Sequence, residues 1–210
     1  MVSHRLIKKI KSRSKSEWAD DILLLVMIVI LAGLYFILNV PTSSVHNLKT
    51  TIDDQIPRLA IFAIPYILYF PLLWGTIFYS WYKNRSFKHL ALAIIVVNLV
   101  AFVTYIFFQT NVPRQPVIED GLLSDLLRFI YSKDQPYNCF PSLHSALSTV
   151  VATYFVCRKS KWAWVFICAA ILVIISTLFV KQHYIVDAIS GLVLGAVTTK
   201  IIFSLFDYKK

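Results

Sequence analysis

Asn138-Cys-Phe-Pro-Ser-Leu-His-Ser145 is one of two short polar stretches that stand where a long apolar run of the sequence begins. The other is Lys181-Gln-His-Tyr-Ile-Val-Asp187, which begins 43 residues further along the chain, after two apolar runs. Ionisable groups cost free energy close to a bilayer, so their presence at both points suggests a function. The remaining apolar segments would then be a scaffold that brings the two stretches together.

The composition around these stretches is typical of a polytopic membrane protein. Hydrophobic residues make up 58% of the 210 residues, charged residues only 15%, and the mean hydropathy is +0.67. A soluble domain is about a quarter charged. Apolar runs that are candidates for membrane spans lie at 22–40, 59–82, 90–109, 142–156, 162–180 and 185–206. The first run is longer than a signal-peptide core and has no small-residue cleavage site, so it is expected to remain as a span.

A further short helix is expected in 110–141, the polar connection between the third and fourth spans. Apolar residues recur there at near-helical spacing, namely Leu122, Leu123, Leu126, Leu127, Phe129 and Ile130. The predicted fold is an all-α integral membrane protein with six transmembrane helices and one amphipathic helix on the membrane surface. Residues 1–18 would be a basic cytoplasmic segment, and residues 19–210 a single catalytic membrane domain with its motifs within 110–191.

The distribution of Lys and Arg predicts the orientation in the membrane. The side that would hold both termini and the two short turns carries fourteen of these residues, and the opposite side carries six. The positive-inside rule therefore puts the termini in the cytoplasm. Arg114, His144, Lys181 and His183 would then lie near the extracytoplasmic face of the plasma membrane. Because the basic residues flank apolar runs, the net charge of +10 does not indicate nucleic-acid binding.

The second stretch places His183 and Asp187 four residues apart at the start of the sixth apolar run. On a helix, that spacing puts both side chains on one face. A carboxylate beside one ring nitrogen makes the other nitrogen a better nucleophile or base, and Lys181 adds a positive charge nearby. The alternative is a structural His–Asp pair that joins helix ends.

The first stretch places Ser142 and His144 at a helix start that Pro141 favours. The N-terminus of a helix offers free N–H groups and a partial positive charge, so it binds phosphate readily. Ser142 could donate its hydroxyl to the same anion, and His144 could protonate a leaving oxygen. The alternative is an N-cap serine and an interfacial histidine.

Both stretches and Arg114 fall on the same predicted membrane face. Two imidazoles, two fixed cations, a hydroxyl and a helix N-terminus are together complementary to a phosphate group. No nearby acidic cluster suits Mg²⁺ or Ca²⁺, and the spacing of His and Cys does not suit zinc. We therefore expect no metal and no cofactor, and a reaction through a phosphohistidine.

At these residues the sequence resembles the type-2 phosphatidic acid phosphatase superfamily, whose members are six-span membrane enzymes that act on lipid phosphates. The family signature has a Lys and an Arg-Pro in its first part, Pro-Ser-Gly-His in its second, and Ser-Arg followed by His-x-x-x-Asp in its third. The resemblance implies that His183 is the nucleophile and Asp187 its orienting partner. It also implies that His144 is the general acid, and that Ser142 and Arg114 bind phosphate.

The sequence departs from this signature at several positions. Leu143 replaces the Gly of the second part in the phosphate-binding turn, and Thr177 replaces the Arg of the third. Gln115 follows Arg114 in place of Pro, and Phe107 stands where the first-part Lys would be. Lys181 is therefore expected to bind phosphate in place of the missing cations. Cys-Phe-Pro-Ser-Leu-His together with Lys-Gln-His-Tyr is similar to the branch that contains inositol phosphorylceramide synthases, which are phosphotransferases.

Other residues are expected to have structural roles. Gly191 and Gly195 form a small-x-x-x-small pair, which favours close helix packing, with a homodimer contact as the alternative. Cys139 stands beside the first stretch but has no partner visible in the sequence, so a catalytic role is not expected for it. Lys133 and Asp134 are interpreted as solvated loop residues, with a place at the rim of the site as the alternative.

The sequence predicts a metal-independent lipid phosphatase that cleaves a phosphate monoester or diphosphate at the outer face of the membrane. Its partners would be a phosphorylated lipid substrate and the surrounding membrane lipids. One alternative is a lipid phosphotransferase, which would pass the phosphoryl or phospho-alcohol group to another alcohol. Another is a non-catalytic binding or transport protein, although the spans lack the deep charged residues of a transport pathway. Phosphatidic acid, phosphatidylglycerol phosphate, isoprenoid diphosphates and sphingoid phosphates all fit as substrates.

Overall fold

A computed structural model describes residues 14–42, 44–83 and 86–207. Its helices are α2 (Lys15–Leu38), α3 (Thr51–Gln55), the 3-10 helix η1 (Ala60–Phe62), α4 (Ala63–Lys83), α5 (Phe87–Phe107), α6 (Leu122–Lys133), α7 (Leu143–Cys157), α8 (Ala163–Phe179) and α9 (Ile185–Asp207). No strand occurs in these ranges, so the all-α prediction is confirmed for them. Residues 1–13, most of the expected N-terminal segment, lie outside the described residues, and α2 already begins at Lys15.

Within the described ranges, four helices are long and apolar enough to cross a membrane: α2, α4 together with η1, α5 and α9. Helices α7 and α8 coincide with the fourth and fifth expected spans but contain 15 and 17 residues. At 1.5 Å per residue they are about 22–26 Å long, whereas the hydrocarbon core of a bilayer is about 30 Å thick. The six-span arrangement therefore holds for four helices by length and composition, and it stays a prediction for α7 and α8.

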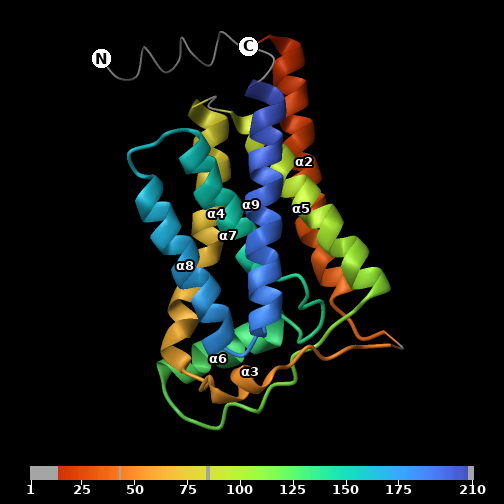
Figure 1. Cartoon of the computed structure of the whole chain (residues 1–210), viewed down its shortest axis with the longest axis vertical. Helices are drawn as coiled ribbons and strands as arrows, with labels where there is room; N and C mark the ends of the chain where they lie inside the picture. The colour runs from red at the N-terminus through yellow and green to blue at the C-terminus, as the bar shows by residue number, and fades with distance from the viewer. Residues whose placement is uncertain (1–13, 43, 84–85, 208–210) are drawn as a thin grey trace.

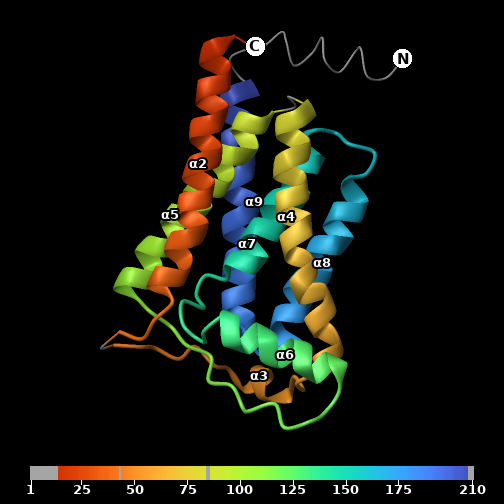
Figure 2. The same ribbon diagram turned by 180° about the vertical axis from the view of Figure 1, so that it is seen from behind.

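The long helices run side by side, with α7 and α9 between the α2–α5 pair and the α4–α8 pair (Figures 1 and 2). The start of α2, the end of α9 and the α7–α8 turn lie at one end of the bundle. Helices α3 and α6 cross the other end, where α7 and α9 begin. The two sequence motifs are therefore at one end, and the basic turns and the described chain ends are at the other.

Helix α7 is enclosed by protein, whereas the outer helices present apolar side chains outward. Thirteen residues of α7, from Leu143 to Phe155, are buried, so its length is not set by contact with lipid. Side chains such as Val29 and Ile37 of α2 are more than half exposed, as expected for a helix in an apolar solvent. Helix α6 is amphipathic, because Leu127 is buried while Leu122 is exposed.

Helices α7 and α9 approach each other closely at the glycine pair. A Cβ added at Gly191 would lie 2.3 Å from the carbonyl oxygen of Ser142, and one added at Gly195 would lie 2.2 Å from that of Ala146. The predicted packing role is therefore correct. The same glycine surface is already used within the chain, so a homodimer would need another contact surface.

We expect Gly191→Ala to lower the free energy of unfolding by about 1–3 kcal/mol, because the added methyl overlaps the α7 backbone. Gly75→Ala is the matched control, since nothing lies within 4 Å of a Cβ added there. Thermal unfolding of both variants in detergent measures the difference. Equal melting temperatures for the two variants would show that the close α7–α9 contact is wrong.

Candidate active site

The two sequence motifs meet where α7 and α9 begin. The Ser142 N–H donates to the Asp187 carbonyl at 3.0 Å, which joins the start of one helix to the first turn of the other. The ring centroids of His144 and His183 are 5.9 Å apart. Both histidines are buried, and the glycine contact described above is what allows this approach. The structure thus brings together His144 and His183, and it joins Ser142 to Asp187.

The Nδ1 side of the His183 ring faces the carboxylate of Asp187. Its Nδ1 lies 3.7 Å from Asp187 Oδ2, within ion-pair range but longer than a hydrogen bond. The same carboxylate oxygen accepts the Tyr184 N–H at 2.8 Å, which caps the start of α9. The backbone N–H of His183 donates to the backbone carbonyl of Thr177 at 3.2 Å. Because Nδ1 faces the carboxylate, Nε2 is the ring nitrogen left for a substrate.

His144 is clamped between two tyrosines of α4. Its ring centroid lies 4.5 Å from the ring centroid of Tyr66 and 4.5 Å from that of Tyr69. These tyrosines are three residues apart, so both face α7 from one side of α4. The clamp fixes the imidazole position at the start of α7.

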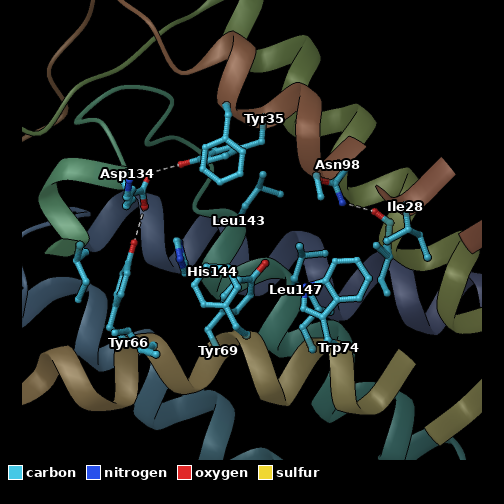
Figure 3. Close-up of a pocket in the computed structure, with 18 of the residues that line it drawn as sticks. Ile28, Tyr35, Tyr66, Tyr69, Trp74, Asn98, Asp134, Leu143, His144 and Leu147 are labelled. Carbon is cyan, nitrogen blue, oxygen red and sulfur yellow. Dashed lines mark hydrogen bonds between the residues drawn. The ribbon is translucent and has the colours of Figure 1, made fainter. Parts of the chain in front are cut away.

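Asp134 anchors this clamp, and its interpretation as a solvated loop residue is wrong. Its Oδ2 accepts the Tyr66 hydroxyl at 2.5 Å, and its Oδ1 accepts the Tyr35 hydroxyl at 2.7 Å and the Asn39 amide at 3.1 Å. Figure 3 shows Tyr35 and Tyr66 reaching Asp134 from opposite sides. The carboxylate therefore joins α2 and α4 to the end of α6. The residues lie far apart in the sequence, so no local pattern could have predicted their contact.

The phosphate-binding candidates occupy different positions. Ser142 is fully buried at the N-cap of α7, where its Oγ accepts the Ser145 N–H at 3.3 Å and can still donate its own proton. Leu143 follows it, buried, as the first residue of α7. Arg114 donates to the Asp134 carbonyl at 2.9 Å and lies over the Tyr131 ring at 4.3 Å. This contact puts Arg114 beside the residue that anchors the His144 clamp.

Lys181 makes contacts that the sequence did not suggest. Its ammonium donates to the carbonyls of Asp53, at 3.1 Å, and Ile56, so it holds the α3 segment. Asp53 in turn accepts the Ile185 N–H at 2.9 Å. Burial lowers the pKa of the Lys181 ammonium. A phosphate-binding role for Lys181 stays a prediction, and it would require the ammonium to leave these carbonyls.

The segment before α7 is fixed by α5 and the α5–α6 connection. The Tyr105 hydroxyl donates to the Pro141 carbonyl at 2.7 Å, and Gln109 donates to the Asn138 side chain at 2.9 Å. Cys139 is buried, and burial raises the pKa of its thiol well above the usual value, which suits a packing residue. In the described ranges, no group of three His, Cys, Asp or Glu side chains is arranged to hold a metal ion.

An apolar cavity of about 370 Å³ opens beside His144. It lies between α2, α4, α5, α6 and α7 and is lined mainly by aliphatic and aromatic side chains (Figure 3). His144 and Asp134 provide polar groups at one part of the wall, and Asn98 provides another. A cavity of this size and lining can hold part of an apolar ligand next to the imidazole.

Comparison with known proteins agrees with this geometry. The sequence profile of the PAP2 superfamily matches residues 22–210. The chain belongs to this superfamily. It is 31% identical over 155 residues to the "Uncharacterized protein MJ0662" of Methanocaldococcus jannaschii, covering 70% of this chain and 63% of the relative. It is 24% identical over 144 residues to the "Phosphoinositol dihydroceramide synthase" of Bacteroides thetaiotaomicron, covering 58% of this chain and 47% of the relative.

The matched regions thus span less than two thirds of the length of either relative. No solved structure matches the chain significantly. Membership of the superfamily is compatible with a membrane lipid phosphatase or phosphotransferase, and this activity is a proposal for the chain. The roles of single residues remain predictions.

We expect Tyr66→Phe to lower the free energy of unfolding by about 1.5–3 kcal/mol, because a buried hydrogen bond to a carboxylate is lost. Tyr69→Phe is the control: its ring makes the same contact with His144, but no hydrogen bond of its hydroxyl is found among the described residues. Chemical unfolding in detergent would measure both. A Tyr66→Phe protein as stable as the control would contradict the anchoring role of Asp134.

Proposed function

We propose that this protein is an integral membrane enzyme that cleaves a phosphoester or diphosphate bond of a lipid through a covalent phosphohistidine. The observation that carries the proposal is the pair of imidazoles. His183 has Asp187 on its Nδ1 side, and the ring of His144 is 5.9 Å away. A phosphorus atom between the two rings would have a nucleophile on one side and an acid on the other.

In the first step, the His183 Nε2 lone pair attacks phosphorus and the bond from phosphorus to the leaving oxygen breaks. His144 gives its proton to that oxygen, so the lipid alcohol leaves neutral. Asp187 stabilises the positive charge that develops on the His183 ring. In the second step, water attacks phosphorus, His144 takes the proton of the water, and the N–P bond breaks. The imidazoles return to their starting protonation states.

Three groups are available to hold the phosphate oxygens. The first turn of α7 directs backbone N–H groups and a partial positive charge toward the site. Ser142 adds a hydroxyl donor at the same helix start. Arg114 could grip two oxygens at once if its guanidinium turned from the Asp134 carbonyl toward the substrate. These donors would stabilise the transferring phosphoryl group without a metal ion.

We further propose that the site faces the outside of the cell and that the protein resides in the plasma membrane. The described chain ends and the α7–α8 turn lie at the end of the bundle opposite the site. The sequence has fourteen of its Lys and Arg residues in the terminal segments and the two short turns. The positive-inside rule then makes the site extracytoplasmic. The substrate would enter from the outer leaflet.

We expect His183→Ala to lose more than about a thousandfold in rate, because the nucleophile is gone, and His144→Ala to lose about a hundredfold to ten-thousandfold. His46→Ala is the control, since this exposed histidine lies at the same end of the bundle outside the site. Phosphate release from a panel of lipid phosphates would measure all three. The wild-type rate should survive a chelator, and wild-type turnover by a folded His183→Ala protein would contradict the mechanism.

In the second step, the phospho-alcohol group on His183 could instead pass to a second lipid alcohol. The apolar cavity beside His144 favours this acceptor over water. The acceptor must reach phosphorus beside His144, where the cavity is lined by apolar side chains such as Leu143 and Leu147. Such a surface favours a lipid alcohol over water. A relative is also named as a synthase of a phosphoinositol lipid. The phospho-alcohol group would then stay on His183 while one lipid alcohol leaves the cavity and another enters.

We expect the wild type, given a labelled phospholipid and a diacylglycerol or ceramide, to form a new labelled lipid. Leu147→Trp should reduce transfer relative to hydrolysis about tenfold, because the larger side chain fills the cavity. Leu192→Trp, on the exposed surface of α9, is the control. Thin-layer separation of labelled lipids from water-soluble products gives the ratio. An unchanged ratio in Leu147→Trp would show that the acceptor does not use the cavity.

A further inference from the structure

A second pocket, of about 310 Å³, lies at the turn between α7 and α8. Three cations line it, namely Arg158, Lys159 and Lys161. Ser160 contributes a hydroxyl, and aromatic side chains that include Tyr79 and Trp162 complete the wall. No carboxylate is among the lining residues, so the pocket carries a concentrated positive charge.

The pocket is separate from the candidate active site. Helix α7 begins at Leu143 beside His144 and ends at Cys157 beside the pocket. Fifteen residues at 1.5 Å per residue place the two ends about 22 Å apart. Figure 1 shows the α7–α8 turn at the end of the bundle opposite α3 and α6. A ligand in this pocket would therefore not touch the histidines.

The turn holds its cations in a fixed arrangement. The Ser160 N–H donates to the Phe155 carbonyl at 3.0 Å and the Lys159 N–H to the Val156 carbonyl at 2.8 Å, which together close a Schellman motif. Lys159 occupies the left-handed position of that motif, with φ of 49°. Glycine is the usual residue there because a Cβ strains that conformation. A lysine at this position keeps a positive charge at a conformational cost.

The described residues do not neutralise the three cations. Across the described ranges, none of them forms an ion pair with a carboxylate. Arg158 donates to the Ser86 hydroxyl at 2.9 Å, which leaves the other guanidinium N–H groups available. The Lys161 ammonium lies 5.4 Å from the Trp162 ring centroid. Three like charges around one cavity repel one another unless an anion joins them.

The surroundings of the pocket indicate the level of the lipid headgroups. Trp162 and Trp164, at the start of α8, are 56% and 64% exposed. Exposed tryptophans at helix ends are typical of the interface between the headgroups and the hydrocarbon. Tyr79 is also exposed and adds an apolar surface toward the bilayer. An anion at this depth would be the phosphate of a lipid.

We propose that this pocket binds the phosphate of an anionic phospholipid in the leaflet opposite the candidate active site. Arg158 and the two lysines would contact the phosphate oxygens, Ser160 would donate its hydroxyl, and the rings would pack on the glycerol part. The inference does not depend on the proposed reaction, because the residues and the location are different.

Native mass spectrometry of delipidated protein in detergent tests this proposal, with phosphatidylglycerol and phosphatidylcholine as probes. The wild type should bind one phosphatidylglycerol with saturation and phosphatidylcholine much more weakly. Lys159→Gln combined with Lys161→Gln should weaken phosphatidylglycerol binding about thirtyfold, since each lysine near a membrane surface contributes about fivefold. Arg158 is left unchanged in order to keep its contact with Ser86.

Lys15→Gln combined with Lys200→Gln is the matched control, because it removes the same charge from exposed positions outside the pocket, at the start of α2 and in the C-terminal half of α9. This control should bind phosphatidylglycerol as the wild type does. Inorganic phosphate at millimolar concentration should not displace the lipid. Equal losses in both double variants, or equal binding of the two lipids, would overturn the proposal. Tighter binding of free phosphate than of phosphatidylglycerol would overturn its assignment to a lipid.

Discussion

The close contact between α7 and α9 is the constraint on which the rest of the structure depends. A side chain at Gly191 would overlap the Ser142 carbonyl, so only a glycine lets the two helix starts come together. The Ser142 N–H then reaches the Asp187 carbonyl, and the two histidines face one another. In an apolar solvent, where helices gain little hydrophobic free energy by associating, such close packing of small residues is a main source of helix contact.

This contact also explains how strongly polar groups can be buried at one end of an apolar bundle. Ser142 and Asp187 are fully buried, and each takes part in a backbone hydrogen bond or a helix cap. Further contacts extend this connection, because Tyr66 and Asp134 join His144 to α2 and α6. Buried polar groups are stable when their partners are in place, so the site and the helix ends support one another.

The features of this arrangement that depend on local sequence patterns could be predicted from the sequence. Apolar runs and helix-start signals predicted α4 to α9 to within about four residues, and the His183–Asp187 spacing placed both on one helix face. Helix α2 begins seven residues before the apolar run at 22–40, and α3 was not predicted. Gly191 and Gly195 were correctly interpreted as packing residues. Helix α7 is shorter than an ordinary span, and it is surrounded by protein and not by lipid. Helix α8 is also short, although only four of its residues are buried. Contacts between distant segments could not be predicted: Asp134 with Tyr66, and Lys181 with α3, follow from tertiary packing and leave no local pattern.

The central claim is that the contact between α7 and α9 makes His183 a nucleophile opposite an acid. Rapid acid-free quenching of the wild type with phosphorus-labelled lipid, followed by peptide mapping, tests it most directly. The account predicts a label on the His183 side chain that forms before product is released and is absent in His183→Ala. A label on another residue would contradict the account, as would single-turnover product formation with no covalent label at all.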